Sequence, residues 1–186
     1  MFDIERFLEE KMNPVFRAYY SIWVHYWPLW RSITSKDILK KWEEYHLMKE
    51  GQTVLDFGCG TGDFTIPAAQ IVRESGRVYA LDYFKRQLGI VKKRIEKEGL
   101  TNVEMIHSDG ETNLPDESVD VIWMCDVLHE VRKRRSVMEE LHRVLKRGGS
   151  LVIYDGMGDK ALEFTENLFS LIDKESKFLR FSKINN

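Results

Sequence analysis

The chain has few of the residues that mark several common protein classes. Its two cysteines, Cys59 and Cys125, form no C-x-x-C pair, so neither a disulfide framework nor a zinc site is indicated, and a reducing cytoplasm is the expected compartment. The charged N-terminus lacks the apolar core of a signal peptide, and no apolar run approaches the roughly 20 residues of a membrane span. A net charge of −2 gives no general attraction to nucleic acid. With 186 residues, 43% of them hydrophobic, the chain suits a single globular domain.

One stretch organises the rest of the sequence. Residues 53–57 predict a strand, Gly58, Gly60 and Gly62 predict a tight turn, and residues 65–72 have helical spacing. Glycines allow positive φ and let a ligand approach bare backbone, while a helix N-terminus offers unpaired N–H groups to an anionic group. The glycine spacing misses the G-x-G-x-x-G dinucleotide fingerprint by one residue, which disfavours an oxidoreductase.

Strand and helix patterns alternate after this turn. Strands are expected at 77–82, 102–107, 119–124 and 150–154, and helices at 85–98 and 132–145. Short apolar strands separated by helices indicate a parallel sheet covered on both faces, with the ligand beyond the carboxyl ends of the strands. The predicted fold class is therefore α/β, with a doubly wound, mostly parallel sheet.

Polar residues follow the second and third predicted strands. Asp82 ends the second strand, where a carboxylate can accept hydrogen bonds from ribose hydroxyls, or can instead cap the next helix. Tyr83 beside it suits the wall of an adenine site. Asp109 and Gly110 follow the third strand, either as an ordinary turn or as a place for the exocyclic amine of adenine.

A candidate base follows the fourth predicted strand. His129 is the first choice because imidazole titrates near neutrality, and Asp126 and Asp155 are further candidates at the same edge of the sheet. Capping a helix or packing beside the sheet is an equally common use of such a histidine. The site at this edge therefore has either a base or a structural histidine.

From Gly51 to Asp155 the sequence resembles the class I methyltransferases that use S-adenosylmethionine, and among them the branch of ubiquinone and menaquinone biosynthesis. Six ordered segments carry this resemblance: residues 54–62, 78–82, 109–115, 118–122, 127–131 and 141–153. It implies a Rossmann-like fold and in-line methyl transfer to a small molecule. The acceptor and its reacting atom, whether N, O, S or C, stay open.

The resemblance also implies roles for individual residues. The glycine turn would hold the methionine part of the cofactor, Asp82 the ribose, Asp109 with Gly110 the adenine, and the backbone near Cys125 the amino group. The turn residues in question are Asp56, Gly58, Cys59, Gly60 and Gly62. Asp126 and Asp155 correspond to the magnesium aspartates of catechol methyltransferases, but Gly156 replaces the asparagine that follows there, so no metal is expected.

The N-terminal 50 residues read as a helical extension with an aromatic stretch at 15–30. These rings either pack the extension onto the core, form a lid over the cofactor with Tyr20 facing an apolar, aromatic or amine-bearing acceptor, or lie at a membrane surface. The lid would comprise residues 1–50 and the cofactor-binding core residues 51–155.

At the C-terminus, residues 156–186 are expected to form a helix over 160–173 and one edge strand, which leaves the sheet a strand shorter than is usual in the family. Either the sheet is short, or a second copy covers the open edge in a homodimer. Two other functions remain open: a protein methyltransferase whose basic helices dock an acidic partner, and a module that binds the cofactor without turning it over.

Overall fold

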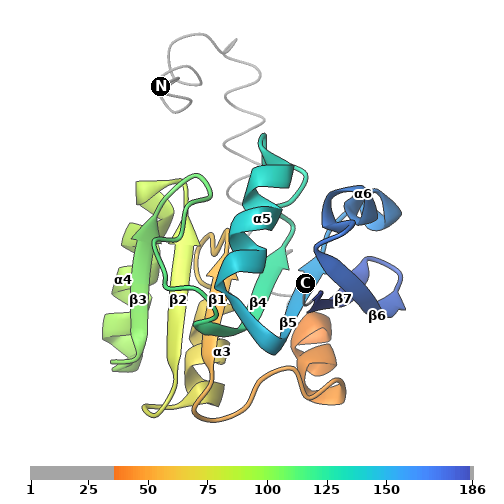
Figure 1. Ribbon diagram of the computed structural model, residues 1–186. Coiled ribbons are helices and arrows are strands. Elements are labelled where there is room, and N and C mark those ends of the chain that lie inside the picture. Colours follow the sequence, from red (N-terminus) through yellow and green to blue (C-terminus); the bar gives the residue numbers. More distant parts are fainter. Residues whose placement is uncertain (1–35, 185–186) are drawn as a thin grey trace, which may run out of the picture. The chain divides into compact units, whose positions relative to one another are not determined.

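The computed structural model describes residues 36–184 of the chain (Figure 1). The chain divides into two units, residues 1–41 and 42–186, and residues 36–44 are helical. Most of the predicted lid, including Tyr20 and the aromatic stretch, lies outside the described residues. Within the described range, no helix has the length and apolar character needed to cross a membrane.

The second unit contains a sheet of seven strands in the order β3-β2-β1-β4-β5-β7-β6. Strands β1 to β5 are parallel, and β7 pairs antiparallel with both β5 and β6. The strands are β1 (Thr53–Phe57), β2 (Arg77–Asp82), β3 (Val103–His107), β4 (Val119–Cys125), β5 (Leu145–Tyr154), β6 (Phe169–Glu175) and β7 (Phe178–Lys183). The helical elements are α3 (Thr65–Val72), α4 (Lys85–Glu98), α5 (Arg134–Val144), the 3-10 helix η1 (Gly158–Ala161) and α6 (Leu162–Thr165).

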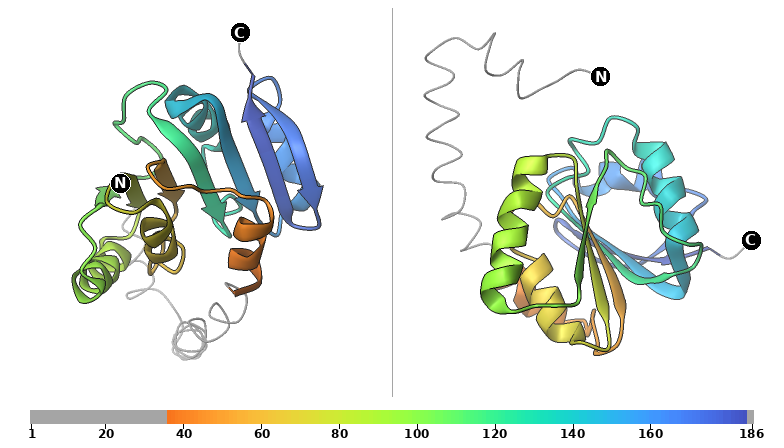
Figure 2. Two further views of the ribbon diagram at one scale, coloured as in Figure 1. Left: turned by 90° about the horizontal axis from the view of Figure 1, so that it is seen from below. Right: turned by 90° about the vertical axis from the view of Figure 1, so that its left-hand side faces the viewer.

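Helices cover both faces of the parallel part of the sheet. Helices α3 and α4 lie on one face and α5 on the other (Figure 2). The central strands β1 and β4 are buried almost throughout, as expected for strands covered on two sides. The edge strand β3 has exposed residues instead. The predicted α/β, doubly wound, mostly parallel fold is therefore confirmed.

An aromatic cluster packs the start of the second unit against the sheet. The ring of Trp42 lies 5.0 Å from that of Trp123 on β4 and 5.5 Å from that of Phe64, and all three side chains are buried. Aromatic pairs at such separations add to the stability gained from the buried area itself. At least this part of the N-terminal aromatic content is used for packing.

The prediction for the C-terminus is wrong. Instead of a helix over 160–173 there are only η1 and the four-residue α6, followed by a two-stranded hairpin, so the sheet has its seventh strand. Both strands fit because the turn between them consists of two residues, Ser176 and Lys177, and Ser176 adopts a left-handed φ of 54°. In the sequence, the largely polar β6 has no apolar alternation strong enough to distinguish it from the end of a helix.

Candidate active site

The site lies where strand order reverses, between β1 and β4. In open α/β sheets such a switch point is where the crevice for a ligand forms. The turn after β1 places Gly58, Gly60 and Gly62 at φ values of 73°, 52° and 85°, a region open to glycine but costly for other residues. A Cβ on Gly58 would lie 2.3 Å from a methyl carbon of Val127 in the loop after β4. The two segments therefore approach each other closely over bare backbone.

Asp82 holds this turn in place. One carboxylate oxygen, Oδ2, accepts a hydrogen bond of 2.8 Å from the N–H of Gly60, and the other, Oδ1, accepts one of 2.8 Å from the N–H of Phe84. The N-cap residue of α4 is Phe84, and no side-chain hydrogen bond caps this helix. Asp82 is therefore not the N-cap of α4. A carboxylate has about four acceptor positions. Asp82 can thus fix the turn and still accept hydrogen bonds from a ligand.

Arg94 is a supporting residue that the sequence did not reveal. From α4, its guanidinium donates to the carbonyl of Thr61 at 2.8 Å and to the carboxylate of Asp63 at 2.7 Å. The hydroxyl of Thr61 also donates to Asp63. Arg94 thereby ties the far side of the glycine turn to the helix after β2. In a helix rich in lysine and arginine, nothing in the sequence separates it from the solvated charges around it.

Three predicted site residues lie inside the domain. Asp56 is 2% exposed and accepts a 2.5 Å hydrogen bond from the hydroxyl of Thr65, the first residue of α3. Cys59 and Cys125 are also buried. Asp56 thus joins the end of β1 to the start of α3. The predicted roles of these residues toward a cofactor remain predictions.

The predicted adenine side is more open. Tyr83 is 40% exposed and its ring stands against that of Phe84 at 5.1 Å. The carbonyl of Tyr83 accepts a 2.9 Å hydrogen bond from Nε2 of His107 at the end of β3. Asp109 is exposed, and a Cβ on Gly110 would lie 2.7 Å from Val137 of α5. The structure thus gathers these residues at the same edge of the sheet as Asp82, and their part in binding adenine remains a prediction.

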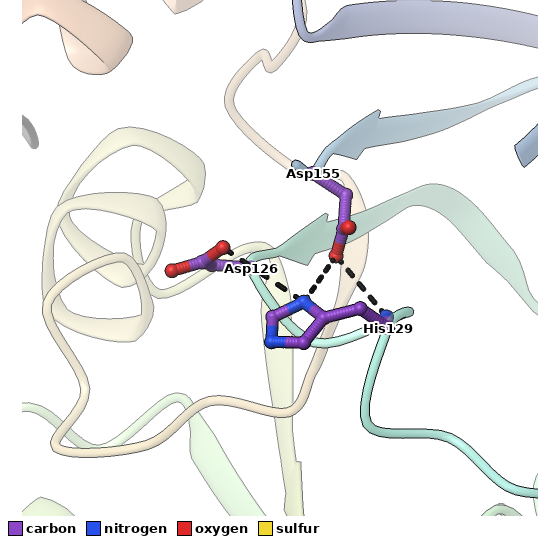
Figure 3. Close-up of side chains that lie close together, drawn as sticks. All are labelled: Asp126, His129 and Asp155. Carbon is purple, nitrogen blue, oxygen red and sulfur yellow. Dashed lines mark hydrogen bonds and ion pairs between the residues drawn. The ribbon is translucent and has the colours of Figure 1, made fainter. Parts of the chain in front are cut away.

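The structure brings together His129, Asp126 and Asp155 (Figure 3). Nδ1 of His129 lies 3.1 Å from Oδ2 of Asp155 and 3.9 Å from Oδ1 of Asp126. Asp126 turns the chain after β4 with a φ of 56°, and Asp155 follows β5. His129 is 44% exposed, whereas Asp155 is 1% exposed. The sequence placed these residues at one edge, but it did not predict that His129 and Asp155 would pair.

Negative charge accumulates around this histidine. Burial raises the pKa of Glu130, and the neighbouring carboxylates of Asp126, Asp82 and Asp155 raise it further, against the opposing effect of His129. Four carboxyl groups therefore lie near one another at the carboxyl ends of the strands, where negative charge favours a cationic ligand.

The same three side chains are the group within residues 36–184 whose spacing suits a metal ion, since their candidate ligand atoms lie within 4.8 Å of one another. Asp155, however, already accepts a 2.9 Å hydrogen bond from the N–H of Met157 through Oδ1 and faces His129 through Oδ2. Each carboxylate oxygen of Asp155 thus already has one hydrogen-bond partner. That no metal is bound at this site stays a prediction.

A family model described as "Methyltransferase domain" matches residues 48–183. The chain belongs to this methyltransferase domain family. A crystal structure described as a SAM-dependent methyltransferase from Aquifex aeolicus is 29% identical, with a TM-score of 0.68, and covers 81% of this chain and 89% of its own. The resemblance to methyltransferases found in the sequence is confirmed. The family and this solved structure identify S-adenosylmethionine as the cofactor.

Curated relatives of this methyltransferase domain point in the same direction. A protein of Geobacillus sp. (strain WCH70), named demethylmenaquinone methyltransferase, is 33% identical over 149 residues, which are 77% of this chain and 62% of the relative. A Bacillus velezensis protein of the same name is 30% identical and matches over 87% of this chain and 71% of its own length. The chain thus spans between 62% and 71% of these two relatives.

The site of this methyltransferase domain fits the cofactor. The glycine turn presents backbone without side chains at positive φ, Asp82 retains acceptor positions for hydroxyl groups, and the exposed ring of Tyr83 follows it directly. A crystal structure from Methanococcus maripaludis, 18% identical with a TM-score of 0.65, shares the fold.

Proposed function

We propose that the chain transfers a methyl group from S-adenosylmethionine to a small, quinone-like acceptor. The observation that carries this proposal is the carboxylate of Asp82, fixed at the end of β2 by the N–H groups of Gly60 and Phe84. A carboxylate that can bind hydroxyl groups thus lies next to a glycine turn, which is the combination that binds a nucleoside in such folds. The quinone-like acceptor is suggested by the names of the curated relatives.

Methyl transfer asks the protein mainly for alignment and exclusion of water. Bound S-adenosylmethionine supplies an activated methyl group, so the acceptor atom bonds the methyl carbon as the carbon–sulfur bond breaks and its electron pair stays on sulfur. The glycine turn and Asp82 would orient the cofactor, with Tyr83, Asp109 and Gly110 on the adenine side. The acceptor would approach from the side of Asp126 and His129, where negative charge favours the sulfonium.

Three further parts of the proposal rest on the sequence. Residues 1–50 would form a lid, with Tyr20 as an acceptor-facing hydroxyl, and the aromatic stretch at 15–30 supports an apolar acceptor. The net charge of −2 speaks against a nucleic-acid substrate. The scarcity of cysteine pairs supports a cytoplasmic location.

The competing function, docking of an acidic protein through basic helices, has less support. On α5, Arg143 pairs with Glu140 and Asp116, and Arg135 pairs with Glu139. Arg134 donates to the backbone carbonyls of residues 128 and 129. Two residues of the basic run at 132–135, Arg134 and Arg135, thus already have partners within the domain, which speaks against docking through them. The basic helix at 85–97 stays a second candidate for such docking.

Calorimetric titration tests the cofactor site. We expect saturable binding of S-adenosylmethionine but not of NAD, and Asp82→Ala should weaken the binding about 10- to 100-fold, since a hydrogen bond to a charged group contributes roughly 1.5–3 kcal/mol. The control is Asp120→Ala, a carboxylate near the start of β4, at the amino ends of the parallel strands, where it accepts hydrogen bonds from the N–H of Thr53 and from Lys146. Affinity that is unchanged in Asp82→Ala would contradict the assignment.

The acceptor is tested with reduced demethylmenaquinone and labelled S-adenosylmethionine. Transfer of label to the quinol supports the proposed acceptor class. Tight cofactor binding without transfer to this quinol or to a panel of phenols and amines would instead favour a module that binds the cofactor without turnover.

A further inference from the structure

The pairing of His129 with Asp155 defines which ring nitrogen is free. Nδ1 lies 3.1 Å from Oδ2 of Asp155. A carboxylate can only accept, so Nδ1 of the neutral ring must be the donor and carry the hydrogen. Nε2 then has its lone pair available. The exposed fraction of the side chain, 44%, leaves the ring accessible from outside the protein core.

Asp155 is itself held firmly. Its side chain is 1% exposed, Oδ1 accepts a 2.9 Å hydrogen bond from the N–H of Met157, and its own N–H donates to the carbonyl of Lys177 in the hairpin turn. The backbone N–H of His129 also points to Oδ2 at 3.4 Å. A buried carboxylate with this many fixed partners can orient an imidazole without moving.

Two further carboxylates lie near the ring. Oδ1 of Asp126 lies 3.9 Å from Nδ1, and Oε1 of Glu130 lies 3.8 Å from Nε2. The carboxylate of Asp82, at the end of β2, contributes to the raised pKa of Glu130. Arg134 of α5 donates to the carbonyl of His129 at 2.7 Å and so fixes the loop. Within residues 36–184, the charged side chains paired with His129 are those of Asp126, Glu130 and Asp155.

We propose that His129 is the catalytic base of the reaction and that Asp155 is its positioning residue. The inference rests on the proposed methyl transfer and defines the acceptor further, as one that loses a proton when it is methylated, such as a phenol or quinol. The proton of the acceptor hydroxyl passes to Nε2, and the oxygen, or a ring carbon conjugated with it, bonds to the methyl carbon while the electron pair of the broken carbon–sulfur bond stays on sulfur. Where carbon is methylated, the ring then loses its C–H proton to solvent and the hydroxyl takes up a proton again. The imidazolium is then stabilised by Asp155 and Glu130.

Kinetics with reduced demethylmenaquinone test the two roles. General base catalysis typically contributes about 10²- to 10⁴-fold, so His129→Gln should lower kcat by that range while S-adenosylmethionine affinity stays within about twofold of wild type. Asp155→Asn should lower kcat with little change in KM, and should change the pH profile of kcat. The matched control is Asp126→Asn, which removes the more distant carboxylate and should reduce kcat by less.

Chemical rescue separates a base from a structural role. Because the ring is accessible, added imidazole should restore part of the activity of His129→Ala, with a rate that rises with the concentration of neutral imidazole. A His129→Gln variant with half or more of the wild-type kcat, or a His129→Ala variant that binds the cofactor normally but gains nothing from imidazole, would overturn the proposal.

The tautomer of His129 can be measured without any acceptor. In ¹⁵N-histidine spectra, neutral His129 should be protonated at Nδ1 in the wild type and should lose this preference in Asp155→Asn. A wild-type ring protonated at Nε2 would overturn the proposal, whereas failure of cofactor binding would overturn only the proposed function. Activity that EDTA abolishes and Mn²⁺ restores would also overturn it, in favour of a metal held by Asp126, His129 and Asp155.

Discussion

The side chain of Glu140 links α5 to the loop between β3 and β4. Its carboxylate accepts hydrogen bonds from Arg143 at 2.8 Å and from the N–H and hydroxyl of Thr112. Arg143 first, and then Thr112, lower the pKa of Glu140 from 4.5 to about 2, against the opposing effect of burial. The charged form of Glu140 is thus favoured in the folded state.

A pH-dependent contribution to stability results from this pKa. Above pH 4.5 the contribution of Glu140 is fully present, and it disappears as the pH falls toward 2, because the unfolded chain binds the proton first. At pH 7 we expect Glu140→Gln to lower the free energy of unfolding by about 1–2 kcal/mol, and the difference from wild type to vanish near pH 2. Chemical denaturation at several pH values measures it.

The control for this prediction is Glu139→Gln. Its exposed pair with Arg135 should contribute well under about 1 kcal/mol. A deficit of Glu140→Gln that stays constant from pH 7 to pH 2 would show that the carboxylate charge is not the cause.

Among single residues, the sequence predicts the position of those at or shortly after the end of a strand. Asp82 and His129 can be recognised because the carboxyl ends of parallel strands share one edge of the sheet. Arg94 and the partnership of His129 with Asp155 cannot, because they depend on the reach of side chains between segments more than 25 residues apart. Periodicity carries no information about such contacts.

Among the elements, the C-terminal hairpin differs most from expectation. Helix α4 has the bounds that the sequence predicts, because its apolar stripe is regular and Gly99 follows in a left-handed conformation. By contrast, α5 passes into β5 at Leu145 without an intervening loop, so β5 begins before the strand that the sequence predicts at 150–154. The hairpin escapes prediction because a two-residue turn without glycine gives little signal.

The turn of this hairpin offers a second test. Ser176 has a left-handed φ of 54°, which costs a non-glycine residue roughly 1 kcal/mol. We therefore expect Ser176→Gly to raise the free energy of unfolding by about 0.5–1 kcal/mol, or a few degrees in Tm. The matched control is Ser170→Gly within β6, where glycine should destabilise by a similar amount. A fall in the Tm of Ser176→Gly would contradict the turn geometry.

For the whole molecule, the end of the described sheet at β6 bears on the oligomeric state. Within residues 36–184, β6 is the last strand of the sheet and leaves Leu171 at 42% and Ile172 at 49% exposure. A homodimer through the C-terminal edge therefore stays a prediction, now with β6 as the pairing strand.

Sedimentation equilibrium tests the dimer. We expect the full chain to sediment as a dimer and Ile172→Lys to sediment as a monomer, because a lysine on an edge strand opposes pairing. Met105→Lys on β3, at the other edge of the sheet, is the control and should not change the mass. A monomeric wild type at all concentrations would exclude pairing through β6.

The close approach of Gly58 to Val127 has a consequence for protein engineering. Because the methyl groups of Val127 fill the space that a side chain at position 58 would need, the cofactor turn and the loop that bears Asp126 and His129 interlock. If two members of the family have side chains of different size at positions 58 and 127, neither segment can be exchanged without the other. A chimera designed to alter acceptor choice should therefore carry both segments from the same parent protein.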